Sequence, residues 1–139
     1  MHISPHLCFD GQCREAMQLY HSVLGGTLQT MLTYGETPMA SSVDSRWHDR
    51  IVHATLVLDG IELTGVDMIA DSYQRPQGFF VTLTVSGIAR ASEIFRRLSH
   101  GGTIKLPFDK TFWSPGFGVF VDRFGIPWEI NTAGGQDVA

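Results

Sequence analysis

The feature that most constrains the fold is an internal repeat. Two glycine pairs, Gly25-Gly26 and Gly101-Gly102, each follow a helical pattern, and 101 minus 25 gives an offset of 76 residues. Adding the same offset to Ile3, where the first strand-like run begins, gives Phe79, where the second begins. A repeat of this kind indicates that one supersecondary unit occurs twice in the chain.

Each copy begins with the same predicted elements. A strand, Ile3 to Phe9 or Phe79 to Val85, precedes a helix that ends at the glycine pair. In the first copy we expect Asp10 to cap a helix that runs to Leu24. Apolar residues at helical spacing predict one buried face on each helix. They are Cys13, Ala16, Tyr20, Val23 and Leu24 in the first copy and Ile88, Ala91, Phe95 and Leu98 in the second.

Three more strands are expected after each glycine pair. They cover residues 27–34, 51–58 and 61–67 in the first copy, and 103–110, 117–121 and 126–131 in the second. Each module is therefore βαβββ, and we place the first at about 1–72 and the second at about 78–133 of a single domain, 1–139. One helix covers only one face of a four-stranded sheet, so the other face must be buried or line a cavity. We predict an α+β fold whose sheets curl into incomplete barrels with the helices outside.

Composition excludes several classes of protein. The chain is 43% hydrophobic and 17% charged, which is typical of a globular protein rather than a disordered one. No apolar run approaches the roughly 20 residues that a membrane helix needs, and the start lacks the pattern of a signal peptide. The 14 acidic and 10 basic residues form no basic cluster, so a nucleic-acid partner is not expected. We expect a cytoplasmic protein without a membrane partner.

The two cysteines predict no disulfide framework. Cys8 lies in a strand-like run and Cys13 lies on the apolar face of a helix, and there is no C-x-x-C pair to hold structural zinc. We expect both to be buried, reduced thiols.

Four segments resemble a known family. They are LCFDGQCREAMQLYHSVLGG, TYGETP, GGTIKLPF and KTFWSPGFGVFVDRFGIPWEIN. Together with the paired βαβββ modules they are similar to the PhnB-like branch of the vicinal oxygen chelate superfamily, which includes glyoxalase I, bleomycin and fosfomycin resistance proteins and extradiol dioxygenases. The resemblance implies the glyoxalase/bleomycin resistance fold, a homodimer and a cavity for a small molecule. It does not supply a reaction.

The resemblance also implies positions for metal ligands. Metal-dependent members of the superfamily bind a divalent ion through His or Glu on the first and last strands of the modules, whereas several resistance proteins use no metal. His6 and Glu129 match two of these positions, but Thr82 and Thr64 occupy the other two. Glu62 shares the alternation of Thr64, which allows an alternative set of His6, Glu62 and Glu129 for zinc, manganese, iron or nickel. We favour no metal.

Glu129 is the candidate catalytic residue. It alternates with Trp128 and Ile130, so it lies on the cavity side if those two side chains pack under the helices. A carboxylate there suits a general base, or an anchor for a cationic or hydroxylated ligand. The opposite phase would place Glu129 on the outer face.

Aromatic side chains supply the candidate ligand-binding residues. Phe112 and Trp113 lie in a loop that contains Pro and Gly, where a buried aromatic has less structural reason to occur. The stretch from Gly35 to Arg50 has no apolar period, and we expect a flexible surface flap there. The predicted ligand-binding set is Tyr34, Trp47, Phe112, Trp113 and Trp128.

Three functions remain open. The first, which we favour, is a metal-free protein that binds or sequesters a small, partly apolar molecule. The second is a metal- or base-assisted enzyme that uses His6 and Glu129. The third is a dimeric interaction module without a small ligand.

Overall fold

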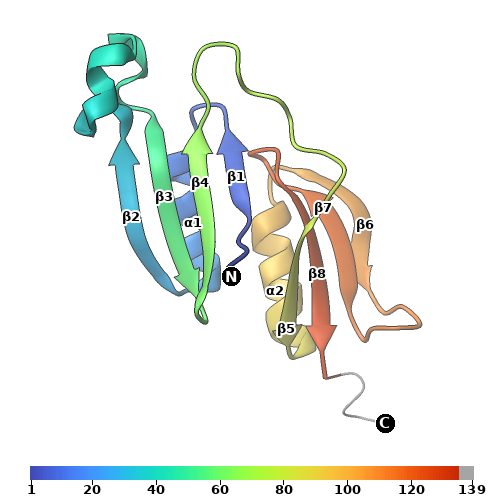
Figure 1. Cartoon of the computed structure of the whole chain (residues 1–139). Coiled ribbons are helices and arrows are strands. Elements are labelled where there is room, and N and C mark those ends of the chain that lie inside the picture. The colour runs from blue at the N-terminus through green and yellow to red at the C-terminus, as the bar shows by residue number, and fades with distance from the viewer. Residues whose placement is uncertain (135–139) are drawn as a thin grey trace. The chain divides into compact units, whose positions relative to one another are not determined.

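The structure, a computed structural model, describes residues 1–134 and consists of two compact units, Met1–Arg75 and Pro76–Ala139. The first contains β1 (His6–Phe9), α1 (Cys13–Leu24), β2 (Thr27–Thr33), β3 (Ile51–Leu58) and β4 (Ile61–Asp67). The second contains β5 (Val81–Ser86), α2 (Ile88–Ser99), β6 (Thr103–Asp109), β7 (Phe117–Val121) and β8 (Pro127–Ala133) (Figure 1). The predicted α+β fold of two βαβββ units is confirmed, although neither sheet is a closed barrel.

The two sheets have the same topology. Their strand orders are β1-β4-β3-β2 and β5-β8-β7-β6, and in each the first strand pairs in parallel with the last. The register places His6 opposite Thr64 in unit 1 and Thr82 opposite Glu129 in unit 2. The sequence repeat therefore extends to the pairing of individual residues.

Each helix covers one face of its own sheet. A Cβ added at Gly65 would lie 3.0 Å from the Cys13 Sγ of α1, and one added at Gly118 would lie 2.5 Å from the Phe95 ring of α2. The residues that alternate with these glycines point to the opposite side, which we call the helix-free face of each sheet. Large buried side chains fill the helix side, among them Phe9, Tyr20 and Leu56 in unit 1 and Phe120, Trp128 and Ile130 in unit 2.

The glycine pairs have two distinct functions. Gly25 and Gly101 have φ values of +81° and +78°, a left-handed conformation that ends the helix and that other residues rarely adopt. A Cβ at Gly26 or Gly102 would instead collide with a strand carbonyl oxygen, that of Val57 or Val121. The repeat thus preserves a helix stop followed by a close backbone contact.

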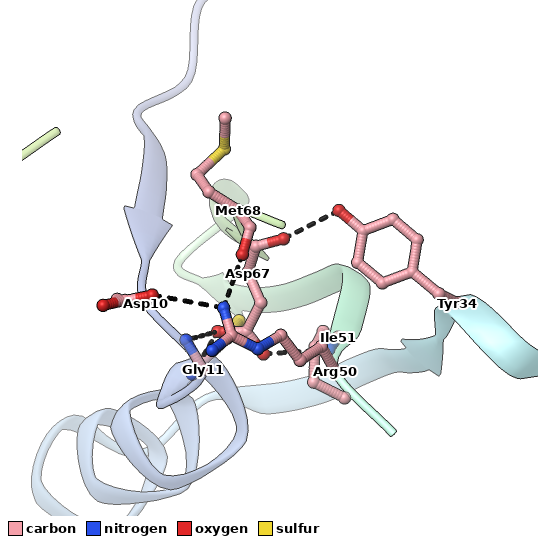
Figure 2. A network of polar contacts seen from close by, with 8 residues as sticks. Asp10, Gly11, Tyr34, Arg50, Ile51, Asp67 and Met68 are labelled. Atoms are coloured by element: carbon pink, nitrogen blue, oxygen red, sulfur yellow. Dashed lines mark hydrogen bonds and ion pairs between the residues drawn. The ribbon is translucent and has the colours of Figure 1, made fainter. Parts of the chain in front are cut away.

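The predicted N-cap at Asp10 is wrong. The helix begins two residues later, its N-cap is Gln12, and the Gln12 side chain makes no capping hydrogen bond. Asp67, at the end of β4, provides the acceptor instead, because its Oδ1 accepts hydrogen bonds from the backbone N–H groups of Gly11 and Cys13, both at 2.9 Å. Asp10 is drawn away from the helix by an ion pair with Arg50, at 3.2 Å (Figure 2).

The first strand of each unit is shorter than predicted. β1 begins at His6 rather than Ile3, and β5 begins at Val81 rather than Phe79. Val81 pairs with Trp128, and the residue before Trp128 is a proline, which has no N–H to extend the ladder.

The two cysteines are free thiols in different environments. Cys13, the first residue of α1, is buried against the sheet, and burial raises its pKa far above the ordinary range. Cys8 is only half-buried, because it lies on the helix-free face, so the expectation that both are buried is wrong for Cys8.

The segment between β2 and β3 is more regular than the absence of apolar periodicity suggests. It contains three short 3-10 helices, η1 (Tyr34–Glu36), η2 (Pro38–Ser42) and η3 (Ser45–Trp47). Each begins with a side-chain oxygen that accepts a backbone N–H, from Thr33, Thr37 and Asp44 respectively. These local caps replace burial as the source of order, so a pattern search based on apolar spacing does not detect them.

Asp67 also joins this segment to the sheet. Its Oδ2 accepts a hydrogen bond from the N–H of Ile51, at 2.9 Å, where β3 begins. The Tyr34 hydroxyl donates to the backbone oxygen of Asp67, at 2.7 Å, and Arg50 donates to the oxygen of Met68, at 2.6 Å (Figure 2). One buried carboxylate therefore connects the start of α1, the start of β3 and the end of β4.

No helix within residues 1–134 is long and apolar enough to cross a membrane.

We predict that Asp67→Asn lowers the free energy of unfolding by about 2–4 kcal/mol, because an amide NH₂ would face at least one of three backbone N–H donors and leave it unpaired. Asp49→Asn, an exposed position in the same unit, is the matched control and should change the free energy by about 0.5 kcal/mol or less. Urea denaturation of the two variants measures both values. Equal stability of the two variants would contradict the central role of Asp67.

Candidate binding site on the helix-free faces

Two hydrogen-bonded pairs occupy equivalent positions in the two units. In unit 1, His6 Nδ1 lies 2.6 Å from Thr64 Oγ1. In unit 2, Thr82 Oγ1 donates to Glu129 Oε1, at 2.9 Å. The four positions singled out from the sequence thus form two pairs, each with one titratable group and one threonine.

The hydroxyl of Thr64 determines the tautomer of His6. Thr64 Oγ1 donates to the backbone oxygen of Pro5, at 3.1 Å, and a carbonyl oxygen can only accept. With the hydroxyl hydrogen directed at Pro5, His6 Nδ1 is assigned as the donor in the 2.6 Å hydrogen bond. In neutral His6 the lone pair then lies on Nε2.

The surroundings of His6 favour its neutral form. Partial desolvation lowers its pKa from the ordinary value of 6.5, and the neighbouring His53 imidazole lowers the pKa further. His53 lies on the same strand face as Thr55, whose Oγ1 is 3.3 Å from His53 Nε2. Near neutral pH, His6 therefore carries a basic ring nitrogen rather than a charge.

Glu129 lies on the helix-free face of unit 2. Its neighbours Trp128 and Ile130 are fully buried, and Phe120, which contacts the Phe95 ring of α2, is the register partner of Trp128. The alternation along β8 therefore directs Glu129 away from the helix. Within residues 1–134, no Lys, Arg or His forms an ion pair with Glu129.

A row of aromatic rings begins beside Glu129. Phe117 follows the same face of β7 as Val119, the register partner of Glu129. The ring of Trp113 lies 5.3 Å from that of Phe117, and the ring of Phe112 lies 4.7 Å from that of Trp113, both in edge-to-face geometry. Phe112 is 97% exposed and Trp113 is 55% exposed. Such exposure is unusual for two adjacent large aromatic residues.

Asn131 is a site residue that the sequence prediction missed. It shares the helix-free face with Glu129 and is the register partner of Phe117 and of Thr84. Its Oδ1 is the one buried side-chain N or O atom without a hydrogen-bond partner in the described part of the chain. The two-residue spacing from Glu129 could have identified Asn131, but its lack of a partner is visible only in three dimensions.

Three of the predicted ligand-binding residues make contacts away from Glu129 and Trp113. Tyr34 is buried and its hydroxyl is engaged with the backbone of Asp67. Trp47 has the guanidinium of Arg50 at 4.5 Å and that of Arg46 at 5.1 Å from its ring. Trp128 is fully buried on the helix side, where its Nε1 donates to Asp122 Oδ2 at 2.9 Å. Trp128 could not share a ligand with Glu129 in any case, since adjacent strand residues point to opposite faces.

Comparison with known proteins identifies the family. A family described as 3-demethylubiquinone-9 3-methyltransferase matches residues 1–131. The chain belongs to this family. It is also 30% identical to Protein YjdN of Escherichia coli strain K12, over 95% of each chain.

Solved structures agree with this assignment. Protein PA1353 of Pseudomonas aeruginosa has a TM-score of 0.85 at 39% identity, covering 95% of this chain and 97% of that one. A Bacillus cereus PhnB protein, described as a putative 3-demethylubiquinone-9 3-methyltransferase, has a TM-score of 0.81 at 23% identity and covers 96% and 100%. The fosfomycin resistance protein FosX of Listeria monocytogenes, at 12% identity, a TM-score of 0.64 and coverage of 99% and 94%, shares the fold alone. The resemblance to the PhnB-like branch of the vicinal oxygen chelate superfamily is confirmed.

The donor set of this PhnB-like chain does not fit a divalent ion within either unit. No group of three His, Cys, Asp or Glu side chains that could hold a metal occurs among residues 1–134. Thr64 and Thr82 stand where two ligands are expected, and each is hydrogen-bonded to the neighbouring candidate, His6 or Glu129. Glu62, the third residue of the alternative ligand set, has its Oε1 atom 3.6 Å from Nε2 of His2.

We predict that His6 titrates below pH 6.5 and carries its neutral-form proton on Nδ1. Thr64→Val removes the acceptor and should shift the neutral tautomer toward Nε2–H, whereas Thr55→Val, the matched control on the adjacent strand, should not. Imidazole ¹⁵N chemical shifts across a pH titration measure both properties. An unchanged tautomer in Thr64→Val would contradict the assignment.

The same pKa shift has a consequence for stability. The folded state binds fewer protons than the unfolded state once the pH falls below about 6.5, so His6 lowers the free energy of unfolding progressively from that pH down to its folded pKa. Above pH 6.5 the effect disappears.

Proposed function

We propose that this protein binds a small, partly aromatic organic molecule on the helix-free face of unit 2 and needs no metal to do so. One observation carries the proposal: Glu129, oriented by Thr82 and without an ion pair among residues 1–134, shares a face with Phe117, which contacts the exposed Trp113. Apolar walls with a few placed polar groups are the usual composition of small-molecule sites.

The loop that carries Phe112 and Trp113 is held in place before any ligand binds. Thr111 N–H donates to the oxygen of Ser114, at 2.9 Å, and Ser114 Oγ donates to the oxygen of Gly116, at 2.8 Å. Thr132 on β8 donates to the same Gly116 oxygen through both its N–H and its hydroxyl, at 2.9 and 2.8 Å. Little ordering entropy would be lost on binding, which supports recognition by this loop.

Burial of the exposed rings supplies the driving force. Each Å² of apolar surface removed from water contributes roughly 25 cal/mol, so a ligand that covers Trp113 and Phe117 gains several kcal/mol before the costs of association. Glu129 then fixes the orientation of the ligand.

The family description names the transfer of a methyl group to a demethylated ubiquinone. Such a substrate is a hydroxylated quinone, whose flat ring would suit the aromatic side chains and whose hydroxyl would suit the carboxylate. Our proposal concerns binding and assigns no transfer reaction. The homodimer and the cytoplasmic location expected from the resemblance belong to the same proposal.

We predict that Trp113→Ala weakens binding of the neutral fluorescent probe N-phenyl-1-naphthylamine about 5- to 30-fold, the loss expected for one aromatic contact of about 1–2 kcal/mol. Ile61→Ala, an equally exposed apolar residue of unit 1, is the control and should leave the affinity unchanged. Fluorescence titration gives the dissociation constants and circular dichroism confirms folding. Equal affinity of wild type and Trp113→Ala would place binding elsewhere.

For the metal, we predict less than about 0.1 equivalent of zinc, manganese, iron or nickel in protein purified without chelator or affinity nickel, because threonines occupy two of the four ligand positions. Elemental analysis is the measurement. A near-stoichiometric ion that is lost in both His6→Ala and Glu129→Ala would instead support the metal-assisted enzyme.

A further inference from the structure

We infer that the ligand of this face is an organic cation with N–H groups, such as an aryl-substituted ammonium or guanidinium, whose charge pairs with Glu129 and whose N–H groups bind Asn131. The inference rests on the proposed binding function and adds the chemical class of the ligand. Three features of the face support it: a carboxylate that forms no ion pair in the described part of the chain, a row of aromatic rings, and an amide oxygen for which residues 1–134 supply no hydrogen-bond donor.

The first feature is the charge. Glu129 is partly exposed, its Oε1 accepts from Thr82, and no positive side chain within residues 1–134 pairs with it. A ligand that covers this face removes water from the carboxylate, and that desolvation is costly unless an opposite charge or donor replaces the water. A cation offsets the cost, whereas an anion adds repulsion.

The neighbours of Glu129 on its own strand and on the two strands beside it carry no positive charge. By alternation along β5, β7 and β8, the neighbours of Glu129 on this side are Thr82, Thr84, Asn131, Phe117 and Val119. They provide hydroxyls, an amide and apolar surface. The only formal charge contributed by these three strands near the site is therefore negative.

The second feature is the row of rings. A cation within about 6 Å of an aromatic face gains roughly 0.5–2 kcal/mol, and tryptophan is the strongest partner. Trp113 lies next to Phe117, which is the diagonal neighbour of Glu129 across β7 and β8. The chain already uses this contact in unit 1, where two guanidinium groups lie over Trp47 at 4.5 and 5.1 Å.

The third feature is Asn131. Its Oδ1 is buried without a hydrogen bond, a condition that native proteins avoid at ordinary structural positions. Asn131 as a whole is only half-buried, and rotation about χ2, a soft torsion in asparagine, presents the oxygen to the helix-free face. A ligand N–H then gains a neutral acceptor two residues from the carboxylate. The carboxylate of Glu129 and the amide oxygen of Asn131 together offer two acceptors, which suits a ligand with N–H groups.

The test compares four probes that share a phenyl group and differ in the polar end. They are 2-phenylethylammonium, trimethyl(2-phenylethyl)ammonium, the neutral 2-phenylethanol and the anion 3-phenylpropanoate. Binding is followed by calorimetry and by NMR shifts of the Trp113 indole. We expect the ammonium to bind about tenfold more tightly than the alcohol, the quaternary ion to bind with intermediate affinity, and the anion to bind most weakly.

Substitutions assign these preferences to residues. Glu129→Gln should reduce the ammonium-to-alcohol affinity ratio to near one, because the ammonium loses its ion pair. Glu93→Gln removes the same charge from the exposed surface of α2, where Glu93 pairs with Arg97 at 3.8 Å, and should leave the ratio unchanged. Asn131→Leu should remove the preference for the primary over the quaternary ammonium without lowering the melting temperature, since the fold does not use the Asn131 oxygen.

The outcomes separate this inference from the binding function. If the alcohol or the anion binds as tightly as the ammonium, and Trp113→Ala weakens all of them, the cation inference is wrong and the binding face stands. If Glu93→Gln acts like Glu129→Gln, only a general charge effect exists and the inference is also wrong. If Trp113→Ala changes neither these probes nor N-phenyl-1-naphthylamine, the binding function itself fails.

Discussion

The buried carboxylate of Asp67 is the interaction on which unit 1 depends. It accepts three backbone N–H groups from two segments that are far apart in sequence, two at the start of α1 and one at the start of β3. The equivalent position in unit 2 is Thr132, which holds Gly116 at the end of the aromatic loop. In both units a side chain on the last strand holds the segment that leads into the preceding strand. In unit 1 the carboxylate of Asp67 on β4 binds the start of β3, and in unit 2 the hydroxyl of Thr132 on β8 binds Gly116 just before β7. The hydrogen bonds from Thr132 to Gly116 therefore position the loop that carries Trp113.

The two units share a pattern of pairing but not its chemistry. Unit 1 combines a neutral histidine with a threonine acceptor, and unit 2 combines a glutamate with a threonine donor. In each pair the threonine satisfies one atom of its partner and leaves the other atom of the imidazole or carboxylate for a ligand. The two repeated units thus have helix-free faces with the same strand pairing but different chemical groups. The face of unit 1 presents a basic ring nitrogen, and the face of unit 2 presents a carboxylate.

The sequence predicted the architecture well because its signals are local. Helix α2, from Ile88 to Ser99, matches its expected apolar period and glycine stop, and each glycine pair has a steric reason that acts on neighbouring residues. The failures involve contacts between distant residues. Asp10 has the right chemistry for a cap, but Asp67 competes for the same N–H groups and Arg50 draws Asp10 away. Whether Tyr34 and Trp128 contribute to a binding wall stays a prediction, and distant contacts that the sequence does not reveal engage their polar ends, with the backbone of Asp67 and the side chain of Asp122. For Glu129 the alternation with Trp128 and Ile130 was sufficient to predict its face, once their burial was known.

The three tryptophans of this chain occupy three different environments. Trp128 is enclosed and hydrogen-bonded, Trp47 is flanked by two guanidinium groups, and Trp113 is partly exposed to solvent beside Phe117. Their emission spectra and their sensitivity to soluble quenchers must therefore differ. The most solvent-sensitive chromophore stands at the candidate site, so the native protein carries its own optical reporter of occupancy there, without a label and without any change to its sequence.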